Sequence, residues 1–127
     1  MVTPSEHWSK ALHNERFIDV HKLADGEFAG WAVTVLFYSA LHWLRALAAQ
    51  EGFQIERYRG KNSEERAFQQ VPLLQESPRL YECYRALKDE SQQARYEMKG
   101  FSSADFYRLS EDCYEPFKSF VTSNIRL

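Results

Sequence analysis

The sequence has little excess charge of either sign. Sixteen Lys and Arg residues stand against 18 Asp and Glu residues, which gives a formal net charge of -2 at pH 7. A chain without a positive excess does not attract polyanions through its overall field, so any contact with nucleic acid must depend on a local patch. The charge balance therefore excludes a histone-like binder.

Cysteine is scarce as well, since Cys83 and Cys113 are the two that the chain contains. They do not form a metal-ligand spacing, and a pair this sparse does not suggest a disulfide framework. We expect both thiols to be reduced and buried in the core, with a disulfide or a metal site as weaker alternatives. No metal and no cofactor is expected.

The chain shows no internal repeat, no low-complexity tract and no linker, so residues 1–127 are expected to form a single domain. No charged segment followed by an apolar segment opens the sequence as it would in a secretory signal. The apolar stretch from Trp31 to Ala49 reaches about membrane-spanning length only if His42 and Arg45 are ignored. We expect a soluble, cytoplasmic protein that does not enter a membrane.

Strand signals are also missing, because apolar and polar residues alternate only in isolation and no hairpin dipeptide separates β-branched runs. Capping residues, prolines and glycines instead predict five helices, over about residues 4–24, 27–51, 62–76, 78–100 and from 102 onward. Gly52 is expected to close the second helix. Pro72 either bends the third helix or ends it near Val71, and Pro116 is expected to kink the last.

The second of these helices is apolar on almost every side, with the sequence WAVTVLFYSALHWLRALAA from residue 31 to 49. A helix of this kind must be surrounded by other elements. The fourth and fifth helices each have one apolar stripe, formed by Leu80, Tyr84, Leu87, Ser91, Ala94 and Met98 and by Phe106, Leu109, Cys113, Phe117 and Phe120. The prediction is an all-α, up-and-down bundle around the second helix.

Three segments carry a resemblance to a known family: WAVTVLFYSALHWLRAL, then KNSEERAF, then YECYRALKDESQQARYE. In order and spacing they resemble the prokaryotic branch of the HEPN superfamily, over roughly residues 8–100. The resemblance implies an all-helical domain that commonly dimerises. It also implies cleavage or binding of RNA in toxin-antitoxin and antiphage systems, in some members together with a nucleotidyltransferase partner.

The chain departs from that family in its catalytic motif. Active members carry an arginine followed after four to six residues by a histidine near the start of a late helix, and two copies meet across the dimer. Here no histidine follows His42. Arg16 and His21 match the spacing, but they lie in the first helix, and we interpret the match as chance. Gly60, Lys61 and Asn62 stand where members of this branch tend to have a histidine before the third helix.

Other residues still allow a binding site. His42 is either a core histidine with one hydrogen bond or a group in a polar cleft shared with Arg66 and Arg95. Arg95 and Tyr96 close the fourth helix, where they serve either a capping and packing role or a binding role. Ser91 faces the packed stripe without an activating base, so we do not predict a serine enzyme.

Basic residues suggest a patch on one side of the molecule. Its members would be Arg85, Lys88, Arg95 and Lys99 along the fourth helix and Arg57, Arg59, Lys61 and Arg66 before it, with Tyr58 or Tyr81 as stacking aromatics. Acidic residues interleave with them, so an ordinary solvated surface is the alternative. The candidate binding residues are His42, Arg59, Arg66, Arg95 and Tyr96.

Two functional hypotheses follow. The first is a non-catalytic HEPN-like module that forms a homodimer and binds RNA, a nucleotide or a protein partner. The second is a metal-independent HEPN-type ribonuclease that draws its acid and base groups from His42, Arg66, Arg95 and Tyr96. Three Trp, seven Tyr and nine Phe residues, more than a core of this size readily encloses, favour the homodimer.

Overall fold

The computed structural model describes residues 2–55, 63–96 and 100–126. Within these ranges the chain is all-α and contains no strand. The helices are α1 (Pro4–Val20), α2 (Ala29–Gln50), α3 (Ser63–Gln70), α4 (Pro72–Gln75), α5 (Pro78–Tyr96), α6 (Ser103–Leu109), a π-helical turn η2 (Ser110–Tyr114) and α7 (Glu115–Asn124). The predicted fold class is confirmed.

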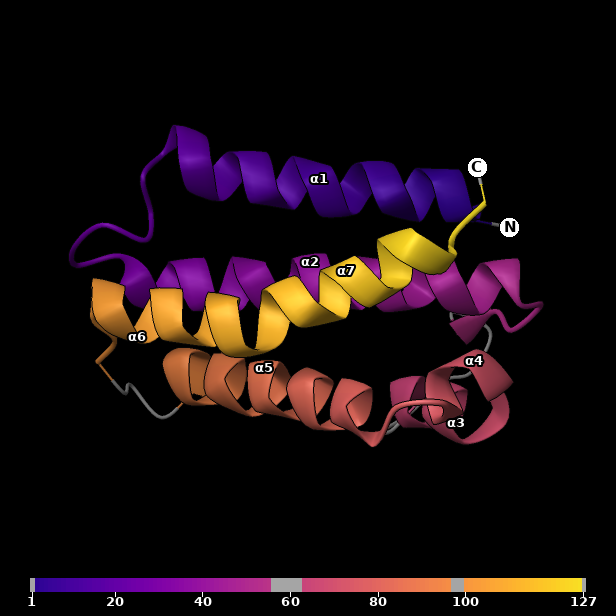
Figure 1. Cartoon of the computed structure of the whole chain (residues 1–127). Helices are drawn as coiled ribbons and strands as arrows, with labels where there is room; N and C mark the ends of the chain where they lie inside the picture. The colour runs from indigo at the N-terminus through magenta and orange to yellow at the C-terminus, as the bar shows by residue number, and fades with distance from the viewer. Residues whose placement is uncertain (1, 56–62, 97–99, 127) are drawn as a thin grey trace.

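The long helices run up and down beside one another, with α2 in the middle (Figure 1). Helix α1 packs along one side of α2 and α5 along the other, and the continuous α6, η2 and α7 cross in front. Both chain ends lie at the end of the bundle where α3 and α4 are found. The end of α5 and the α1–α2 connection lie at the opposite end.

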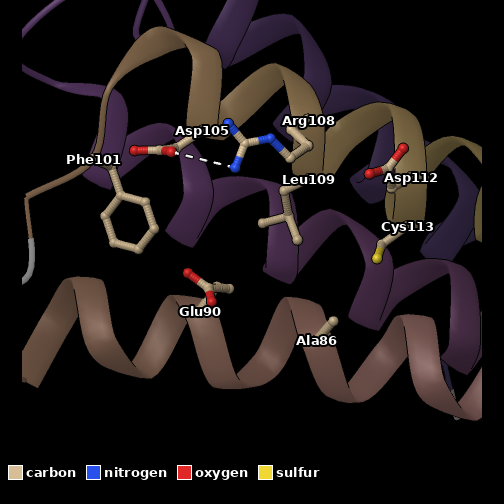
Figure 2. A pocket seen from close by; sticks show the side chains of 8 residues that line it. All are labelled: Ala86, Glu90, Phe101, Asp105, Arg108, Leu109, Asp112 and Cys113. Carbon is tan, nitrogen blue, oxygen red and sulfur yellow. Dashed lines mark ion pairs between the residues drawn. The ribbon is translucent and has the colours of Figure 1, made fainter.

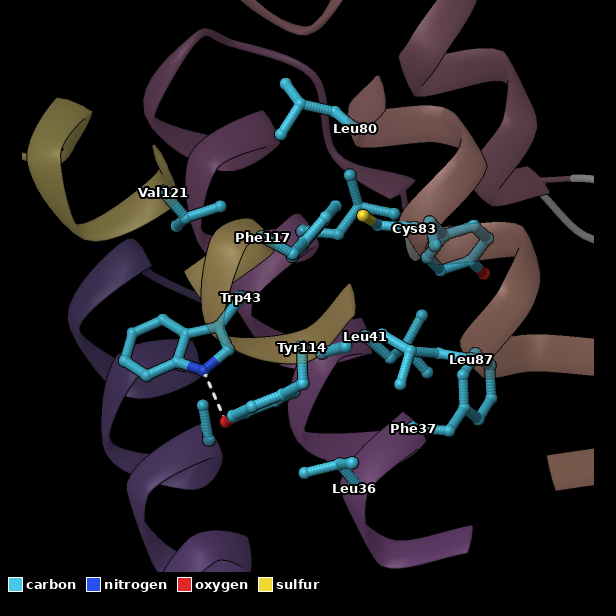
Figure 3. Close-up of a cluster of buried hydrophobic side chains, with 14 of the residues drawn as sticks. Leu36, Phe37, Leu41, Trp43, Leu80, Cys83, Leu87, Tyr114, Phe117 and Val121 are labelled. Carbon is cyan, nitrogen blue, oxygen red and sulfur yellow. Dashed lines mark hydrogen bonds between the residues drawn. The ribbon is translucent and has the colours of Figure 1, made fainter. Parts of the chain in front are cut away.

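Helix α2 is the core of the bundle, as its sequence predicts, and 14 of its 22 residues are buried. The largest fully buried side chains include Trp43 of α2 itself and Tyr84, Tyr114 and Phe117 of the helices around it (Figure 3). By length and composition alone α2 could cross a membrane, but most of it is enclosed by the other helices. A mostly buried helix of this kind is what the interior of a helical bundle requires.

A hydroxyl group in this core joins three helices. Trp43 Nε1 donates to the Tyr114 hydroxyl at 2.9 Å, and the Tyr114 hydroxyl in turn donates to the Glu15 carboxylate. Ser39 Oγ lies 2.7 Å from the same oxygen and contacts the carbonyl of Ala11 at 2.8 Å. Because buried polar groups are costly unless paired, this network fixes how α1, α2 and η2 face one another.

Several predicted helix starts are confirmed. The hydroxyl of Thr3 accepts a hydrogen bond from the Glu6 amide at 3.1 Å and caps α1. Ser102 and Asp105 form a capping box before α6, with side chain to backbone distances of 3.1 and 2.9 Å. Helix α5 begins at Pro78, as predicted.

The predicted end of the first helix near residue 24 is wrong, because α1 ends at Val20. Lys22 adopts a left-handed conformation with φ of 50°. The Leu23 amide then reaches the Ile18 carbonyl at 3.1 Å, and the Lys22 amide reaches the Asp19 carbonyl at 3.3 Å. These two bonds form a Schellman motif, which stops a helix by satisfying its last carbonyls.

The same motif ends α2, this time with the glycine that the sequence predicts. Gly52 has φ of 86°, and the Phe53 amide donates to the Ala48 carbonyl at 2.8 Å. The helix starts at Ala29, two residues after the predicted start. At Pro72 the predicted third helix is interrupted, so that α3 ends at Gln70 and α4 begins at the proline.

The sequence predicts a kink at Pro116, and the structure has a π-helical turn directly before Glu115 and Pro116. In an α-helix the Asp112 carbonyl would accept from residue 116, but proline has no N–H to give. The Glu115 amide instead bonds the Ser110 carbonyl, five residues back. The Asp112 carbonyl accepts from Arg79 Nη2 on α5 at 2.9 Å. The last helix is thereby tied to α5.

The predicted apolar stripes face the core. Leu80, Tyr84, Leu87 and Ser91 of α5 are buried and Ala94 is half-buried, whereas Met98 lies outside the described residues. In the last helix Phe106 and Phe117 are buried, and Leu109, Cys113 and Phe120 are half-buried.

The two cysteines are free thiols, as expected. Cys83 is buried, but Cys113 is half-buried, which corrects the expectation that both lie inside the core.

Candidate binding site

Arg95 lies in the last turn of α5 with its guanidinium between two tyrosines. Its Nη1 donates to the Tyr38 hydroxyl at 2.7 Å, and its Cζ lies 5.5 Å from the ring centroid of Tyr38 and 5.0 Å from that of Tyr96. Both distances fall within the range of cation-π contact. Nε and Nη2 turn toward the carbonyl and hydroxyl of Ser91, at 3.3 and 3.4 Å. The guanidinium is therefore held from two helices.

Aromatic rings around this guanidinium are exposed. Tyr38 is 39% exposed, Trp31 63% and Tyr96 74%. Trp31 and Tyr38 are seven residues apart on α2 and share a helix face. We call Trp31, Tyr38, Arg95 and Tyr96 the aromatic–arginine cluster. It presents large flat side chains and a cation where the end of α5 lies against α2.

A cavity of about 460 Å³ adjoins the cluster. It is lined by Glu27, Gly30, Trp31, Thr34, Ala94, Arg95, Gly100 and Phe101. Gly30 leaves room in its wall, since a Cβ atom there would stand 3.7 Å from the Phe101 ring and 3.9 Å from the Ala94 methyl group. The volume is within the range of small-molecule sites, so one flat group can enter between α2 and α5.

Two other basic residues of α5, Arg85 and Lys88, pair with carboxylates. Lys88 Nζ lies 3.0 Å and Arg85 Nη1 3.2 Å from Glu65 Oε1, and Arg85 also pairs with Asp89 at 3.4 Å. Burial alone would raise the pKa of Glu65, but the hydrogen bonds and charges of Lys88 and Arg85 outweigh it, so the pKa lies below its usual value. For Arg85 and Lys88 these ion pairs favour the alternative of an ordinary surface over a basic patch. Among the described residues, no ion pair joins Arg95 to a carboxylate.

His42 contacts a second histidine on α1. Its Nδ1 lies 3.0 Å from Nδ1 of His7, and the two ring centroids are 5.3 Å apart. His42 is half-buried and His7 is 3% exposed. Since one of the two nitrogens donates and the other accepts, at least one of these rings carries no proton on Nδ1. Of the two alternatives, the geometry favours a histidine paired in the α1–α2 contact.

Of the remaining predicted residues, Arg66 does not join this group. Arg66 is exposed on α3, near the start of α5, whereas Arg95 is near its end (Figure 1). Arg59 lies outside the described residues, together with Arg57, Tyr58, Lys61 and Lys99. Tyr81 packs edge-on against Phe68 at 5.2 Å. Of the five candidates, the structure brings together Arg95 and Tyr96.

The arginine and histidine with the family spacing lie on the exposed side of α1. Arg16 and His21 line a surface depression of about 190 Å³ with His13, Phe17 and Val20. The ring of His21 lies against that of Phe17 at 4.7 Å. Both residues are exposed.

Sequence reasoning missed Trp31 and Tyr38 as site residues. Each was assigned to the apolar core helix, although their seven-residue spacing marks a common face that includes two large aromatic side chains. That spacing was the available signal. The contact with Arg95 itself spans 57 residues of sequence and leaves no local pattern.

The described residues include no group of three or more His, Cys, Asp or Glu side chains arranged to hold a metal ion. Ser91 is fully buried and donates to the Lys88 carbonyl at 2.9 Å, which suits packing rather than nucleophilic attack. Comparison with protein-family models, curated proteins and solved structures finds no match for the chain.

Proposed function

We propose that the chain is a non-catalytic, HEPN-like helical module of the cytoplasm that dimerises and binds unpaired RNA at the aromatic–arginine cluster. The observation that carries the proposal is the guanidinium of Arg95, held over the rings of Tyr38 and Tyr96. A toxin-antitoxin or antiphage setting, with a nucleotidyltransferase among the candidate protein partners, follows from the family resemblance.

The cluster has both parts that single-stranded nucleic acid requires. Exposed Trp31 and Tyr96 offer ring faces on which bases stack, and stacking contributes about 1–3 kcal/mol per base. Arg95 supplies a charge that complements a phosphate. The contacts with Tyr38 and Ser91 use three of its five N–H groups, so two remain available. Because the rings and the cation are already in place, little ordering is needed on binding.

Unpaired RNA suits this site better than a duplex. Bases in a duplex are stacked on one another and are not free to lie on side chains, whereas loops and single strands can be splayed onto aromatic rings. The net charge of -2 gives no general attraction for a duplex backbone. A free nucleotide in the adjoining cavity would use the same two interactions, which are stacking of its base on an aromatic ring and contact of its phosphate with Arg95.

The test is binding of a fluorescently labelled, unstructured RNA of about ten nucleotides, measured by anisotropy at low and at physiological salt. We expect Trp31→Ala and Arg95→Ala each to weaken binding by about tenfold, equivalent to about 1.4 kcal/mol. Arg95→Ala should also reduce the dependence of affinity on salt, because a phosphate contact is lost.

Matched controls come from α6, which lies at the same end of the bundle but contributes no residue to the cluster (Figure 1). Arg108 is 68% exposed and pairs with Asp105, and Tyr107 is 46% exposed, so Arg108→Ala and Tyr107→Ala remove similar groups outside the cluster. Neither should change the affinity. Equal binding by all four variants, or no binding by the wild-type protein at low salt, would contradict the proposal.

Within the described part of the chain, the contacts of His42 and Arg95 do not support the ribonuclease alternative. Its acid and base groups would have to converge, but His42 contacts His7 on α1 while Arg95 contacts Tyr38 and Ser91. The cavity that Arg95 lines does not include His42. Incubating the labelled RNA with the purified protein separates the two hypotheses, and we expect the RNA to stay intact.

A further inference from the structure

Cys83 and Cys113, 30 positions apart in sequence, meet where α5 packs against η2. The thiol of Cys83 lies 3.8 Å from the carbonyl oxygen of Asp112, the residue that precedes Cys113. Each thiol is also close enough to shift the pKa of the other. No local pattern in the sequence brings them together. The π-helical turn that Pro116 imposes sets the position of Cys113.

Only one of the two thiols can be reached from solvent. Cys113 lines a surface cavity of about 230 Å³, where its sulfur is directed from the last helix toward α5 (Figure 2). Cys83 is 3% exposed and lies among the core side chains (Figure 3). An accessible thiol can be oxidised first, and a buried thiol close to it can then react with the oxidised sulfur to form a disulfide.

We propose that Cys83 and Cys113 form a reversible intramolecular disulfide when a small peroxide enters this cavity. The sulfur of Cys113 attacks one oxygen of hydrogen peroxide, the O–O bond breaks, and the products are a Cys113 sulfenic acid and one water. The sulfur of Cys83 then attacks the sulfur of that sulfenic acid, an S–S bond forms, and the hydroxyl group leaves as a second water with the proton of Cys83. Two thiols are oxidised and one peroxide is reduced.

The reaction is slow at neutral pH. Burial and then the neighbouring thiol raise the pKa of Cys113 to about 11, and burial raises the pKa of Cys83. Arg79 opposes these shifts, while Asp112 adds to both and Glu82 adds to that of Cys83. The thiolate is the reactive form, so the rate should rise about tenfold per pH unit between pH 7 and pH 9. The pair responds to sustained oxidation rather than to a brief pulse.

The test is treatment of the native, folded protein with hydrogen peroxide, followed by alkylation of remaining thiols and intact mass measurement. We expect the loss of two hydrogen atoms from the monomer, no alkylation, and a cross-linked peptide pair that contains residues 83 and 113. Dithiothreitol should restore both thiols. In Cys83→Ser, Cys113 should accumulate as a sulfenic acid that dimedone traps.

A second variant tests placement rather than reactivity. Glu82→Cys combined with Cys83→Ser moves the thiol one position along α5 to an exposed site, and it should not cross-link to Cys113. Four outcomes would each overturn the proposal. In the wild type these are over-oxidation of Cys113 beside an intact Cys83 thiol, disulfide-linked dimers, and thiols that do not react. In the double variant it is cross-linking of the displaced cysteine to Cys113 as efficiently as in the wild type. The wild-type measurement decides the matter even if a variant fails to fold.

Discussion

The indole nitrogen of Trp43 donates a 2.9 Å hydrogen bond to the hydroxyl of Tyr114, and this bond joins the central helix to the π-helical turn (Figure 3). Burial, followed by the nearby Glu15 carboxylate, raises the pKa of Tyr114 well above its usual value. The hydroxyl therefore stays protonated at any physiological pH. It serves as acceptor and donor at once.

Tyr114→Phe should lower the free energy of unfolding by about 1–3 kcal/mol, because it leaves the buried Trp43 donor and its neighbours without their partner. Tyr84 provides the matched control. Its hydroxyl is buried and has no hydrogen-bond partner among the described residues, so Tyr84→Phe should be neutral or slightly stabilising. Urea unfolding of both variants checks the pair, and equal losses would contradict the assignment of Tyr114 as the centre of the network.

Glu65 should make stability depend on pH in the acid range. Its pKa in the folded protein is below the value of 4.5 that it has without neighbours, despite the opposing effect of burial, because Lys88 and Arg85 stabilise its charge. The stabilisation is fully present above the unfolded pKa and is lost as pH falls through the folded one. Glu65→Gln should therefore destabilise the protein at pH 7, and its difference from wild type should shrink below about pH 4. A difference independent of pH would argue against this ion pair.

Helices α1 and α2 end in the same Schellman motif, and substitutions at its left-handed position should change the free energy of unfolding in opposite directions. Lys22 and Gly52 occupy the same left-handed position, with φ of 50° and 86°. Lys22→Gly should raise the free energy of unfolding by about 0.5–1 kcal/mol, and Gly52→Ala should lower it by about 1 kcal/mol. A Cβ atom at Gly52 meets nothing within 4 Å, so the loss reflects backbone conformation and not a clash. Thermal unfolding that moved both variants in the same direction would refute the shared geometry.

His42→Ala should destabilise the fold by about 1–3 kcal/mol, because it removes a half-buried ring and the partner of His7. We expect no separate loss of RNA binding once the folded fraction is equal. His13→Ala, which removes an exposed histidine from α1, is the control and should change little. A variant of His42 that folds normally but loses an RNA-cleaving activity would revive the ribonuclease hypothesis.

Dimerisation is directly measurable by sedimentation. We expect a homodimer at tens of micromolar, motivated by large apolar side chains that stay exposed, including Phe17 at 45% and Val20 at 66%. A monomer at high micromolar concentration would rule it out.

Local features of the fold were predictable because their causes are local. Helix starts were predicted from Thr3, Pro78 and Ser102, and a helix end from Gly52. Each of these residues acts on backbone groups within a few residues of itself. The turn at Lys22 gave no such signal, since lysine is not a residue that favours a left-handed conformation. The nearby apolar residues Ile18 and Leu23 pack into the core, and this packing favours the left-handed turn at Lys22 instead.

The candidate site was predictable in part, for a physical reason. Arg95 and Tyr96 stand out because they end a helix. Tyr38 and Trp31 belong to a helix whose other faces are buried, and only the packing of α5 decides which face stays open. The pairing of Arg85 and Lys88 with Glu65 likewise depends on where α3 docks, so the sequence alone does not decide between a basic patch and an ordinary solvated surface.

The placement of the two chain ends has a practical consequence. Both emerge at the end of the bundle that also holds α3 and α4, whereas Arg95 and Tyr96 end α5 at the opposite end (Figure 1). A tag, a fluorophore or an attachment to a sensor chip at either terminus therefore leaves the end with the aromatic–arginine cluster pointing outward. Immobilised protein should report the same affinity as protein free in solution.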